Sequence, residues 1–503
     1  MPALRKYGFL FSFVLLSLAF LPLNLYVLAY FAFIPLFFTP GSPKKRAFLY
    51  YLTGVFFFSS RLYWILFLQV EPRVKPFLAV GFALMVLYLA LYFGAFGFLF
   101  GIIEKSRTPT GLKLLLLPSL WVLLEYIRNH GATGFPWSPL WMSQLGDLRI
   151  SQTASLLGPY YLSWLTLLVN WGIFLSIRYR RAVYALIPLL FVFVSEIYGV
   201  LTLRKPTEQA EKIRVALFQP NVLPREYYDP EEWRETENAF QELNRELKDS
   251  VDLIVLSESA LPGFYRFSKR AQELIGEIID IHGAPVLLGT SDRERAGKEY
   301  LFYNSALLID TSRRIASKYD KTHLVPFGEW LPYEDRLPFL RNIDLGQGNY
   351  TPGREISPLV VKKAKFGVLI CFESIFPEIS RAFCRRGAGF LVNITSDGWY
   401  GRTLGPVEHF HLARFRAIEE GRYLVRAAKT GISAVVDDKG RIVKSLGLFE
   451  RGLLTAEIPL LQRETFYARY GHFFPQVIML IVVILLFIMW VRKVRKNQEE
   501  VSR

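Results

Sequence analysis

The sequence contains only two cysteines, Cys371 and Cys384, in a chain of 503 residues. Two thiols cannot form the disulfide framework of a small secreted scaffold, so that class of protein is excluded. Low-complexity tracts are also lacking, and 52% of the residues are hydrophobic, which excludes a disordered chain. Charged residues make up 21% of the chain, more than a wholly buried protein carries. This composition indicates a membrane part joined to a water-soluble part.

Apolar residues gather in the first two hundred positions and once more near the C-terminus. A membrane-spanning helix needs about 20 apolar residues. We expect eight spans, at roughly 9–22, 24–38, 47–68, 77–103, 114–127, 160–177, 182–202 and 475–491. No small-residue cleavage site follows the first span, so we expect a retained helix rather than a signal peptide. The predicted domains are a seven-span block at 1–203, a hydrophilic domain at 204–474, the eighth span at 475–491 and a basic tail at 492–503.

The basic residues predict the orientation of these spans, because Lys and Arg mark cytoplasmic loops. With the N-terminus inside, the segments on the cytoplasmic side carry 16 basic and three acidic residues, and the net charge of the whole chain is +16. The hydrophilic domain is therefore close to neutral, which argues against a nucleic-acid partner. Both termini are expected in the cytoplasm and the hydrophilic domain on the outer face of the membrane.

Besides Glu196, near the outer end of the seventh span, two charged residues fall inside predicted spans, Arg61 in the third and Glu125 in the fifth. Charge within a membrane is costly, so such residues usually pair or line a polar cavity. A structural ion pair or snorkelling explains both, and contact with a phospholipid headgroup is the functional alternative. On the functional alternative, Arg61 is a candidate substrate contact.

The hydrophilic domain alternates apolar runs with amphipathic stretches, which predicts a layered α/β fold. Strands are expected at 213–219, 251–256, 285–289, 304–310, 366–370, 389–393, 423–428, 433–437 and 441–444. Helices are expected at 230–248, 268–282, 377–386 and 407–421.

Three reactive side chains follow predicted strands, where the sites of α/β proteins form. Glu258 follows VDLIVL, Lys321 follows KYD after an expected strand pair near 300–320, and Cys371 follows FGVLI and precedes a helix. Taken singly, a Cys is most often a small buried hydrophobe, and the Glu and Lys are most often surface charges. Together, a carboxylate can act as a base toward the thiol and a Lys can stabilise an oxyanion. For Cys384, inside a predicted helix, we keep the structural interpretation.

These residues lie in LSESALPG (256–263), KYDKTHLVPFGEW (318–330) and GVLICFESIFPE (367–378). In this order they resemble the Glu–Lys–Cys signature of the nitrilase superfamily. Placed between a seven-span block and a final span, such a domain is similar to the apolipoprotein N-acyltransferase family. GFPW (134–137), NITSDGWYG (393–401) and the stretch 409–433 also match, so the resemblance covers essentially the whole chain.

The resemblance implies an αββα nitrilase-like domain inserted in an eight-helix transmembrane bundle of the bacterial inner membrane, with the domain in the periplasm. It implies Glu258 as general base, Lys321 as oxyanion-stabilising residue and Cys371 as nucleophile. Glu329 and Glu373 would support the site. The implied reaction moves an acyl chain from a phospholipid, at sn-1, through a Cys thioester to the N-terminal amine of a diacylglyceryl-cysteine apolipoprotein.

Five positions depart from the family pattern. Leu256-Ser257 replaces Trp-Pro, Phe372 replaces a Tyr after the nucleophile, Lys429 replaces an Asn, and Tyr228 stands where a lipid-contacting Trp is usual. These changes affect the expected substrate preference and leave the three reactive residues intact.

A loop over 330–350 mixes apolar and aromatic residues with Pro and Gly. Together with Trp399 it is expected to dip into the membrane interface, where Trp and Tyr are favoured, and ordinary core packing is the alternative. Trp330 and Trp399 are therefore candidate substrate contacts. The resemblance adds Tyr228 as a third. His409 and His411 lack further ligands at metal-binding spacing, so they are expected to be structural, with no metal. No glycine-rich phosphate loop follows a strand, so no cofactor is expected.

Two other functions fit parts of this pattern. A membrane-tethered nitrilase-type amidase would use the same three residues with water as acceptor, although one anchor would suffice for tethering. A transporter with an accessory domain would need charges lining several spans, and only Arg61, Glu125 and Glu196 occur there.

Overall fold

The computed structural model describes residues 2–20, 22–131, 134–223, 229–331 and 349–501. The chain forms two compact units. The first, the helical unit, comprises Met1–Tyr63, Leu78–Lys205 and Tyr470–Arg503. The second, the sandwich unit, comprises Trp64–Phe77 and Pro206–Arg469. The basic tail expected at 492–503 continues α15, and residues 502 and 503 lie outside the described part.

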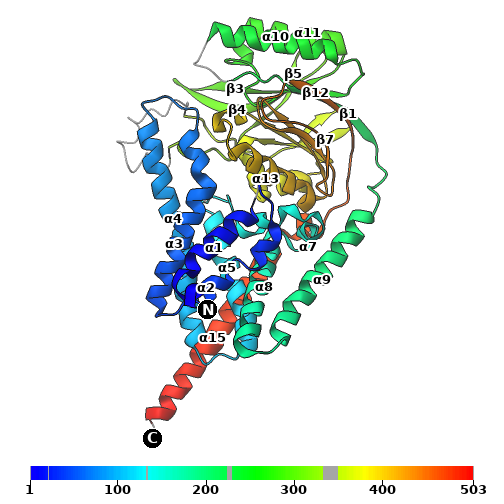
Figure 1. The fold of residues 1–503 in the computed structure, drawn as a ribbon. Coiled ribbons are helices and arrows are strands. Elements are labelled where there is room, and N and C mark those ends of the chain that lie inside the picture. Colours follow the sequence, from blue (N-terminus) through cyan, green and yellow to red (C-terminus); the bar gives the residue numbers. More distant parts are fainter. Residues whose placement is uncertain (1, 21, 132–133, 224–228, 332–348, 502–503) are drawn as a thin grey trace. The chain divides into compact units, whose positions relative to one another are not determined.

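The helical unit is built from helices that differ greatly in length (Figure 1). They are α1 (Pro2–Ala19), η1 (Tyr26–Tyr30), α2 (Ile34–Phe37), α3 (Pro43–Leu62), α4 (Lys75–Lys105), α5 (Thr110–Asn129), η3 (Leu140–Gly146), α6 (Leu148–Ser151), α7 (Ala154–Leu157), α8 (Pro159–Tyr179), α9 (Val183–Arg204) and α15 (Phe473–Val501). Within the described residues, four of them (α4, α5, α8 and α9) are long and apolar enough to cross a membrane. Shorter apolar stretches occur at Tyr26–Phe37 and Phe473–Ile488. The sequence predicts eight membrane spans. Among the described residues, four helices have the length and composition that a span needs.

The segment expected as a span at 24–38 is not one continuous helix. It consists of the 3-10 helix η1 and the single-turn helix α2, whose first turn contains Pro35. Asn170 on α8 bonds to the interrupted backbone, with Oδ1 accepting from the Phe33 N–H at 2.8 Å and Nδ2 donating to the Ala29 carbonyl at 2.8 Å. Broken helices are tolerated in an apolar medium only where other groups satisfy the freed backbone in this way.

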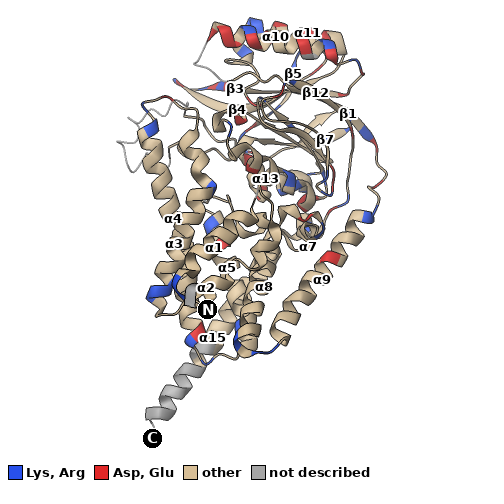
Figure 2. Cartoon of the chain, in the orientation of Figure 1, with Lys and Arg blue, Asp and Glu red and all other residues tan. Residues whose placement is uncertain are grey.

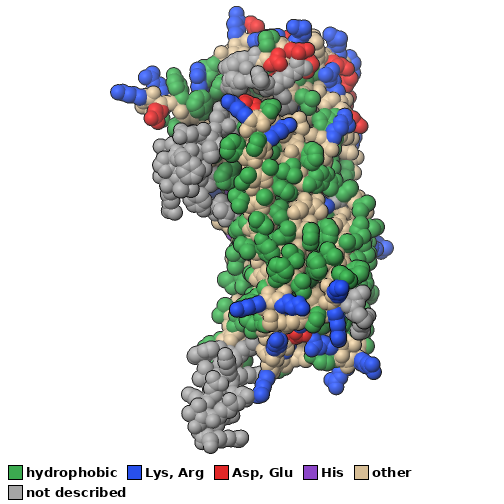
Figure 3. All heavy atoms as spheres, turned by 60° about the vertical axis from the view of Figure 1, so that its left-hand side comes forward, with side chains coloured by type: hydrophobic (Ala, Val, Ile, Leu, Met, Phe, Trp, Pro, Cys, Tyr) green, Lys and Arg blue, Asp and Glu red, His purple; other side chains and the backbone are tan. Residues whose placement is uncertain are grey.

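Charged residues of the helical unit lie mainly near helix ends, whereas the middles of the helices carry few charges (Figure 2). On the face drawn in Figure 3, apolar side chains cover these helices, and Lys and Arg gather at one end. On α9 alone, Leu186, Leu190, Phe193 and Leu201 are exposed. An outward-facing apolar surface of this size suits contact with lipid.

The sandwich unit is built from two six-stranded sheets (Figure 1). The first sheet has the order β12-β1-β2-β3-β4-β5, and the second has the order β11-β10-β9-β8-β7-β6. The first contains β1 (Lys212–Gln219), β2 (Leu253–Val255), β3 (Val286–Ala296), β4 (Glu299–Ile309), β5 (Ile315–Asp320) and β12 (Gly452–Pro459). The second contains β6 (Leu359–Val361), β7 (Ala364–Ile370), β8 (Phe390–Thr395), β9 (Tyr423–Ala428), β10 (Ser433–Val436) and β11 (Ile442–Leu446).

Two helices cover the outer face of each sheet, which gives the expected αββα order. Helices α10 (Pro230–Glu246) and α11 (Lys269–His282) pack on the first sheet, with Phe240 and Ile275 in one buried cluster with Ile254 and Leu307. Helices α12 (Pro377–Arg385) and α13 (Gly405–Glu420) pack on the second. The two sheets contact each other through β1 with β9 and β4 with β7.

The strand pattern from sequence missed three features. Strands β3 and β4 extend beyond the predicted ranges as a long antiparallel hairpin, from Val286 paired with Ile309 to Ala296 paired with Glu299. Strands β6 and β12 were not predicted. The residues of β12 are mostly half-buried, so they lack the sharp alternation that marks a strand in sequence.

One short segment between α3 and α4 belongs to the sandwich unit although most of its two flanking helices does not. The Gln69 N–H donates to the Trp399 carbonyl at 2.8 Å. The Trp64 ring lies edge-on to the Tyr400 ring, with centroids 5.0 Å apart. We call residues 64–77 the tether segment.

Candidate active site

The three reactive residues predicted from sequence lie at the ends of three strands. Glu258 comes shortly after β2, Lys321 directly after β5, and Cys371 directly after β7, where it opens the 3-10 helix η6 (Cys371–Ile375). Glu258 and Lys321 are buried, and Cys371 is partly exposed. The position of Glu258 depends on Gly289 of β3, where a Cβ atom would lie 2.6 Å from the Glu258 Cα.

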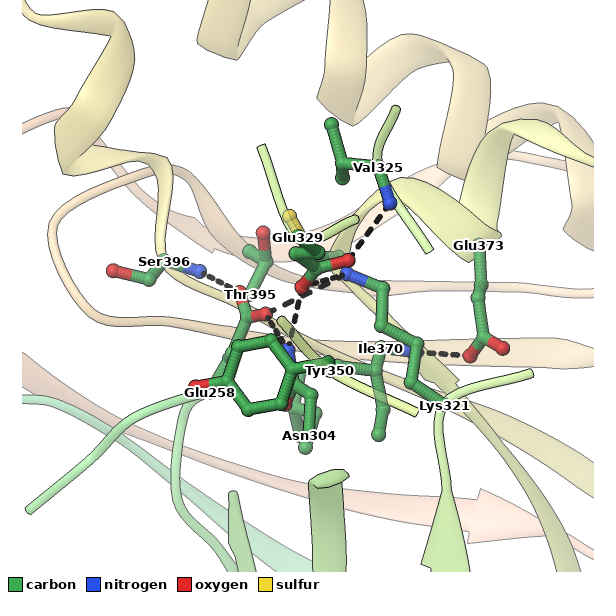
Figure 4. Close-up of polar contacts among 12 residues, drawn as sticks. Glu258, Asn304, Lys321, Val325, Glu329, Tyr350, Ile370, Glu373, Thr395 and Ser396 are labelled. Carbon is green, nitrogen blue, oxygen red and sulfur yellow. Dashed lines mark hydrogen bonds and ion pairs between the residues drawn. The ribbon is translucent and has the colours of Figure 1, made fainter. Parts of the chain in front are cut away.

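Both carboxylate oxygens of Glu258 accept hydrogen bonds. Oε1 accepts from Asn304 Nδ2 at 2.8 Å, and Oε2 accepts from the Ser396 N–H at 2.9 Å (Figure 4). Lys321 Nζ lies 3.9 Å from Oε1. The carboxylate is therefore held by donors from both sheets, because Asn304 is on β4 and Ser396 follows β8.

Lys321 lies between two carboxylates. Its Nζ donates to Glu329 Oε1 at 2.8 Å, and Asn304 Nδ2 donates to the same oxygen at 2.9 Å. Glu329 Oε2 accepts from the Val325 N–H at 2.8 Å, which fixes the carboxylate to its own loop. Glu329 is therefore in direct contact with the Lys that the resemblance expects it to support. The bridging Asn304 was missed, because an Asn within a predicted strand carries no distinguishing signal.

The electrostatics of the cluster favour a neutral thiol beside a charged Lys. Burial raises the pKa of Glu258, and the Lys321 ammonium only partly offsets the rise. Burial by itself would lower the pKa of Lys321, but the carboxylates of Glu329 and Glu258 outweigh it and hold that pKa above its ordinary value. Burial, and then the charge of Glu258, raises the pKa of the Cys371 thiol. The resting thiol thus needs a base to become the reactive thiolate.

Glu373, two residues after the thiol, is a buried acceptor for the surrounding backbone. Its Oε2 accepts from the Ile370 N–H at 2.9 Å, and its Oε1 accepts from the Tyr319 hydroxyl and the Thr322 N–H, each at 2.7 Å. Oε1 also accepts from the Thr322 hydroxyl at 2.9 Å and the His323 N–H at 3.2 Å. This carboxylate ties the end of β7 to the loop after β5, and therefore ties Cys371 to Lys321.

Glu373→Gln tests this supporting role. A Gln presents one NH2 group where only donors face it, and an unsatisfied buried donor costs about 1–3 kcal/mol. We expect the free energy of unfolding to fall by that amount, measured by denaturant titration in detergent, together with loss of activity. Glu378→Gln, in the first turn of α12, is the matched carboxylate control. Equal stability of the two variants would contradict the supporting role.

The other predicted contacts are spread over the chain. Trp330 follows Glu329, and its carbonyl accepts from the Phe327 N–H at 2.8 Å. Trp399 lies in the turn after β8 and contacts the tether segment. Arg61 belongs to the helical unit, where it is buried with its guanidinium 5.3 Å from the centre of the Phe20 ring. Tyr228 lies outside the described residues, as do residues 332–348 of the predicted loop.

Two of the residues that depart from the family pattern, Phe372 and Lys429, have well-defined contacts in the structure. The Phe372 ring is buried and lies 5.1 Å from the Phe376 ring, so it packs without needing a hydroxyl. Lys429 follows β9, and its buried Nζ donates to Glu232 Oε1 at 2.9 Å in the first turn of α10. The ion pair of Lys429 with Glu232 therefore links the start of α10 to the end of β9 in the second sheet.

Comparisons with known proteins agree with this architecture. A family model described as carbon-nitrogen hydrolase matches residues 214–466, and a model described as the apolipoprotein N-acyltransferase N-terminal domain matches residues 12–172. The apolipoprotein N-acyltransferase of Geobacter metallireducens is 36% identical over 482 residues, covering 92% of this chain and 90% of the relative. That of Rhodopseudomonas palustris is 32% identical over 465 residues (86% and 84%), and that of Haemophilus ducreyi is 28% identical over 471 residues (90% and 91%). The chain therefore belongs to the apolipoprotein N-acyltransferase family, as a membrane protein in which a nitrilase-like domain carries out the N-acylation of lipoproteins.

Proposed function

We propose that this enzyme transfers an acyl chain in two steps, with Cys371 as the nucleophile that carries the chain between them. The donor is a phospholipid and the acceptor is the N-terminal amine of a diacylglyceryl-cysteine apolipoprotein. The observation that carries this proposal is the grouping of Glu258, Lys321 and Cys371 at strand ends in a chain of this family.

In the first step Glu258 takes the thiol proton, and the thiolate of Cys371 attacks the sn-1 ester carbonyl. The sulfur–carbon bond forms while the ester carbon–oxygen bond breaks, and the proton passes from Glu258 to the departing lysophospholipid alkoxide. Lys321 faces the negative oxygen of the tetrahedral intermediate, a role that suits an ammonium held in place by Glu329 at 2.8 Å.

In the second step the free amine of the apolipoprotein attacks the thioester carbonyl. A nitrogen–carbon bond forms, the sulfur–carbon bond breaks, and Glu258 moves the proton from the amine to the leaving thiolate. The product is a triacylated lipoprotein, and the enzyme returns to its starting state. Neither step as proposed calls for a metal or cofactor.

The thioester must be shielded from water between the two steps. We assign this role to the segment 330–350 together with Trp399. The two ends of the segment lie beside the cluster, because the Tyr350 N–H donates to the Glu329 carbonyl at 2.9 Å. Hydrogen exchange across 330–350 with and without lipid tests the idea, and unchanged protection contradicts it.

We further propose that the enzyme resides in the bacterial inner membrane, with the sandwich unit in the periplasm and both termini in the cytoplasm. The support is the concentration of Lys and Arg in the segments that alternate with the spans on the cytoplasmic side. Cysteines introduced at Lys298 and at Arg180, in an enzyme whose own thiols are removed by Cys371→Ser and Cys384→Ser, should separate the two faces. In intact cells an impermeant maleimide should label the first and not the second, and the reverse pattern would overturn the orientation.

Mass mapping of the enzyme after incubation with phospholipid tests the chemistry. The expected result is an acyl chain on the peptide that contains Cys371, stable until a diacylated lipopeptide is added. Rapid loss of that chain to water, with no transfer to the amine, would indicate hydrolysis of the amidase type. Absence of any acylated peptide would overturn the two-step proposal.

Lys321→Ala is expected to slow acylation of Cys371 by roughly 10²–10³, as is typical of losing an oxyanion donor. The variant also leaves the carboxylates of Glu258 and Glu329 without their shared cation, so a loss of activity alone is ambiguous. The double variant Lys321→Ala with Glu329→Gln removes one of those charges. Single-turnover intact-mass kinetics should show that the double variant stays slow, whereas recovery would mean that Lys321 only balances charge.

A further inference from the structure

The backbone of Cys371 has a conformation that few residues other than glycine adopt. Its φ angle is +50°, in the left-handed region. Such a conformation persists only where the surroundings hold it. On the N-terminal side, Glu373 Oε2 accepts a hydrogen bond from the Ile370 N–H. On the other side the carbonyl of Cys371 itself is held, by two donors.

The first of these donors is the Ser374 hydroxyl, which donates to the Cys371 carbonyl at 2.8 Å. The second is His409, a fully buried residue in the first turns of α13, whose Nε2 lies 3.1 Å from the same carbonyl oxygen. Nε2 also lies 3.1 Å from the Ser374 Oγ. Since a carbonyl oxygen only accepts hydrogen bonds, Nε2 carries a proton and donates it.

The opposite side of the ring also faces an acceptor. Nδ1 of His409 lies 2.9 Å from Asp397 Oδ1, which in turn accepts from the Thr395 hydroxyl at 2.9 Å. Asp397 Oδ2 accepts from Arg426 Nη2 at 2.6 Å. Burial alone would raise the pKa of Asp397, but the charges of Arg426 and His409 outweigh it and keep that pKa well below the ordinary value. An ionised carboxylate therefore faces Nδ1 and orients the ring, and Arg426 Nη2 lies 3.3 Å from the same nitrogen.

These contacts connect the nucleophile to the centre of the second sheet, because Asp397 follows β8 and Arg426 is on β9. The surroundings of Asp397 are closely packed, because a Cβ atom at Gly431 would lie 2.3 Å from Asp397 Oδ2. The sequence predicts only a structural His here, and the contact with the carbonyl of Cys371 gives that residue a more specific task.

We propose that His409 is a positioning residue that holds the carbonyl of Cys371 and so keeps the nucleophile in its left-handed conformation, aimed at the acyl carbonyl. This inference rests on the proposed role of Cys371 as nucleophile. His409 acts through the backbone of Cys371, and its orientation comes from Asp397.

Two substitutions at His409 separate this role from packing. In His409→Gln the side-chain amide nitrogen can take the place of Nε2 and still donate to the Cys371 carbonyl. In His409→Asn the amide nitrogen takes the place of Nδ1, so the bond to Asp397 can survive while the bond to Cys371 is lost. We expect His409→Gln to stay within about tenfold of the unchanged enzyme, and His409→Asn to lose on the order of 10²-fold in the acylation rate, as small misplacements of a reacting group do.

The readout is the single-turnover acetylation of Cys371 by p-nitrophenyl acetate, in full-length enzyme that also carries Cys384→Ser so that one thiol remains. The thiol sulfur takes the acetyl group, its proton goes to Glu258, and p-nitrophenolate leaves and is followed by its colour. Because this donor contains no lipid, failure of phospholipid transfer alone would count against the proposed function and leave the positioning role standing.

Equal loss in both His409 variants at unchanged melting temperature would overturn the proposal, as would full activity in both. If neither variant folds, Ser374→Ala removes the other donor to the same carbonyl with little change in volume. That variant should acetylate about three- to tenfold more slowly, as expected for one hydrogen bond. An unchanged rate in it would show that the Cys371 carbonyl needs no such support.

Discussion

Replacing Cys371 by Ser is expected to abolish the acyl-enzyme and to lower lipoprotein acylation by on the order of 10⁴ or more, as in other enzymes that lose their nucleophile. The serine hydroxyl is far less acidic than a thiol, and the Cys371 thiol already has a raised pKa because of burial and the Glu258 charge. Glu258 can therefore not generate a useful alkoxide at this position. Intact-mass analysis after incubation with phospholipid provides the measurement.

The second thiol of the chain supplies the matched control. Cys384 lies buried in α12, and we expect Cys384→Ser to retain normal acyl transfer and one acyl chain per enzyme. If the Cys371→Ser variant gave an acylated active-site peptide in normal yield, the assignment of the nucleophile would be contradicted. Appreciable loss of transfer in Cys384→Ser would point to the wrong choice between the two thiols.

Replacing Glu258 by Gln is expected to have two effects of opposite sign. Turnover should fall below detection, because the only carboxylate placed to take the thiol proton in this proposal is gone. The thiol itself should become easier to ionise, because the Glu258 charge raises the pKa of Cys371 and an uncharged Gln does not. Lys321, which lowers the thiol pKa, remains in place in this variant.

Alkylation by iodoacetamide as a function of pH measures the second effect. In a Cys384→Ser background, the midpoint for Cys371 should shift to lower pH in Glu258→Gln than in the unchanged enzyme. In the enzyme with Glu258 intact, kcat/KM should fall as the pH drops through the pKa of Glu258. Since burial raises that pKa, the fall should begin at a higher pH than for an ordinary Glu. A shift of the alkylation midpoint to higher pH would contradict the proposed proximity of the two groups.

Residues at the ends of strands could be predicted because an apolar run followed by a polar residue marks the place where a strand leaves the core. Glu258 after VDLIVL and Cys371 after FGVLI satisfy this rule, whereas Lys321 follows the polar end of a strand, KYD. The structure places Lys321 Nζ 3.9 Å from Glu258 Oε1. The resemblance to a known family gave the order of the motifs, and with it the supporting Glu329 and Glu373. Local pattern and family signature thus point to the same cluster.

Residues that act across the sandwich could not be predicted in the same way. Asn304 lies in the middle of a strand, and its bridge between Glu258 and Glu329 depends on how three loops meet. His409 is one of several polar residues on a helix that is buried on nearly every side. The break in the segment 24–38 depends on Asn170, more than 130 positions away in the chain. Each of these features arises from tertiary contacts that no local window contains.

The tether segment has a consequence for any attempt to dissect this enzyme. A fragment cut at 206 and 469 would look like a complete soluble hydrolase, yet it would lack the indole of Trp64 that lies against the Tyr400 ring. The carbonyl of Trp399 would also lose the amide of Gln69. Such a fragment would carry an altered loop next to Asp397, so its behaviour would say little about the intact protein.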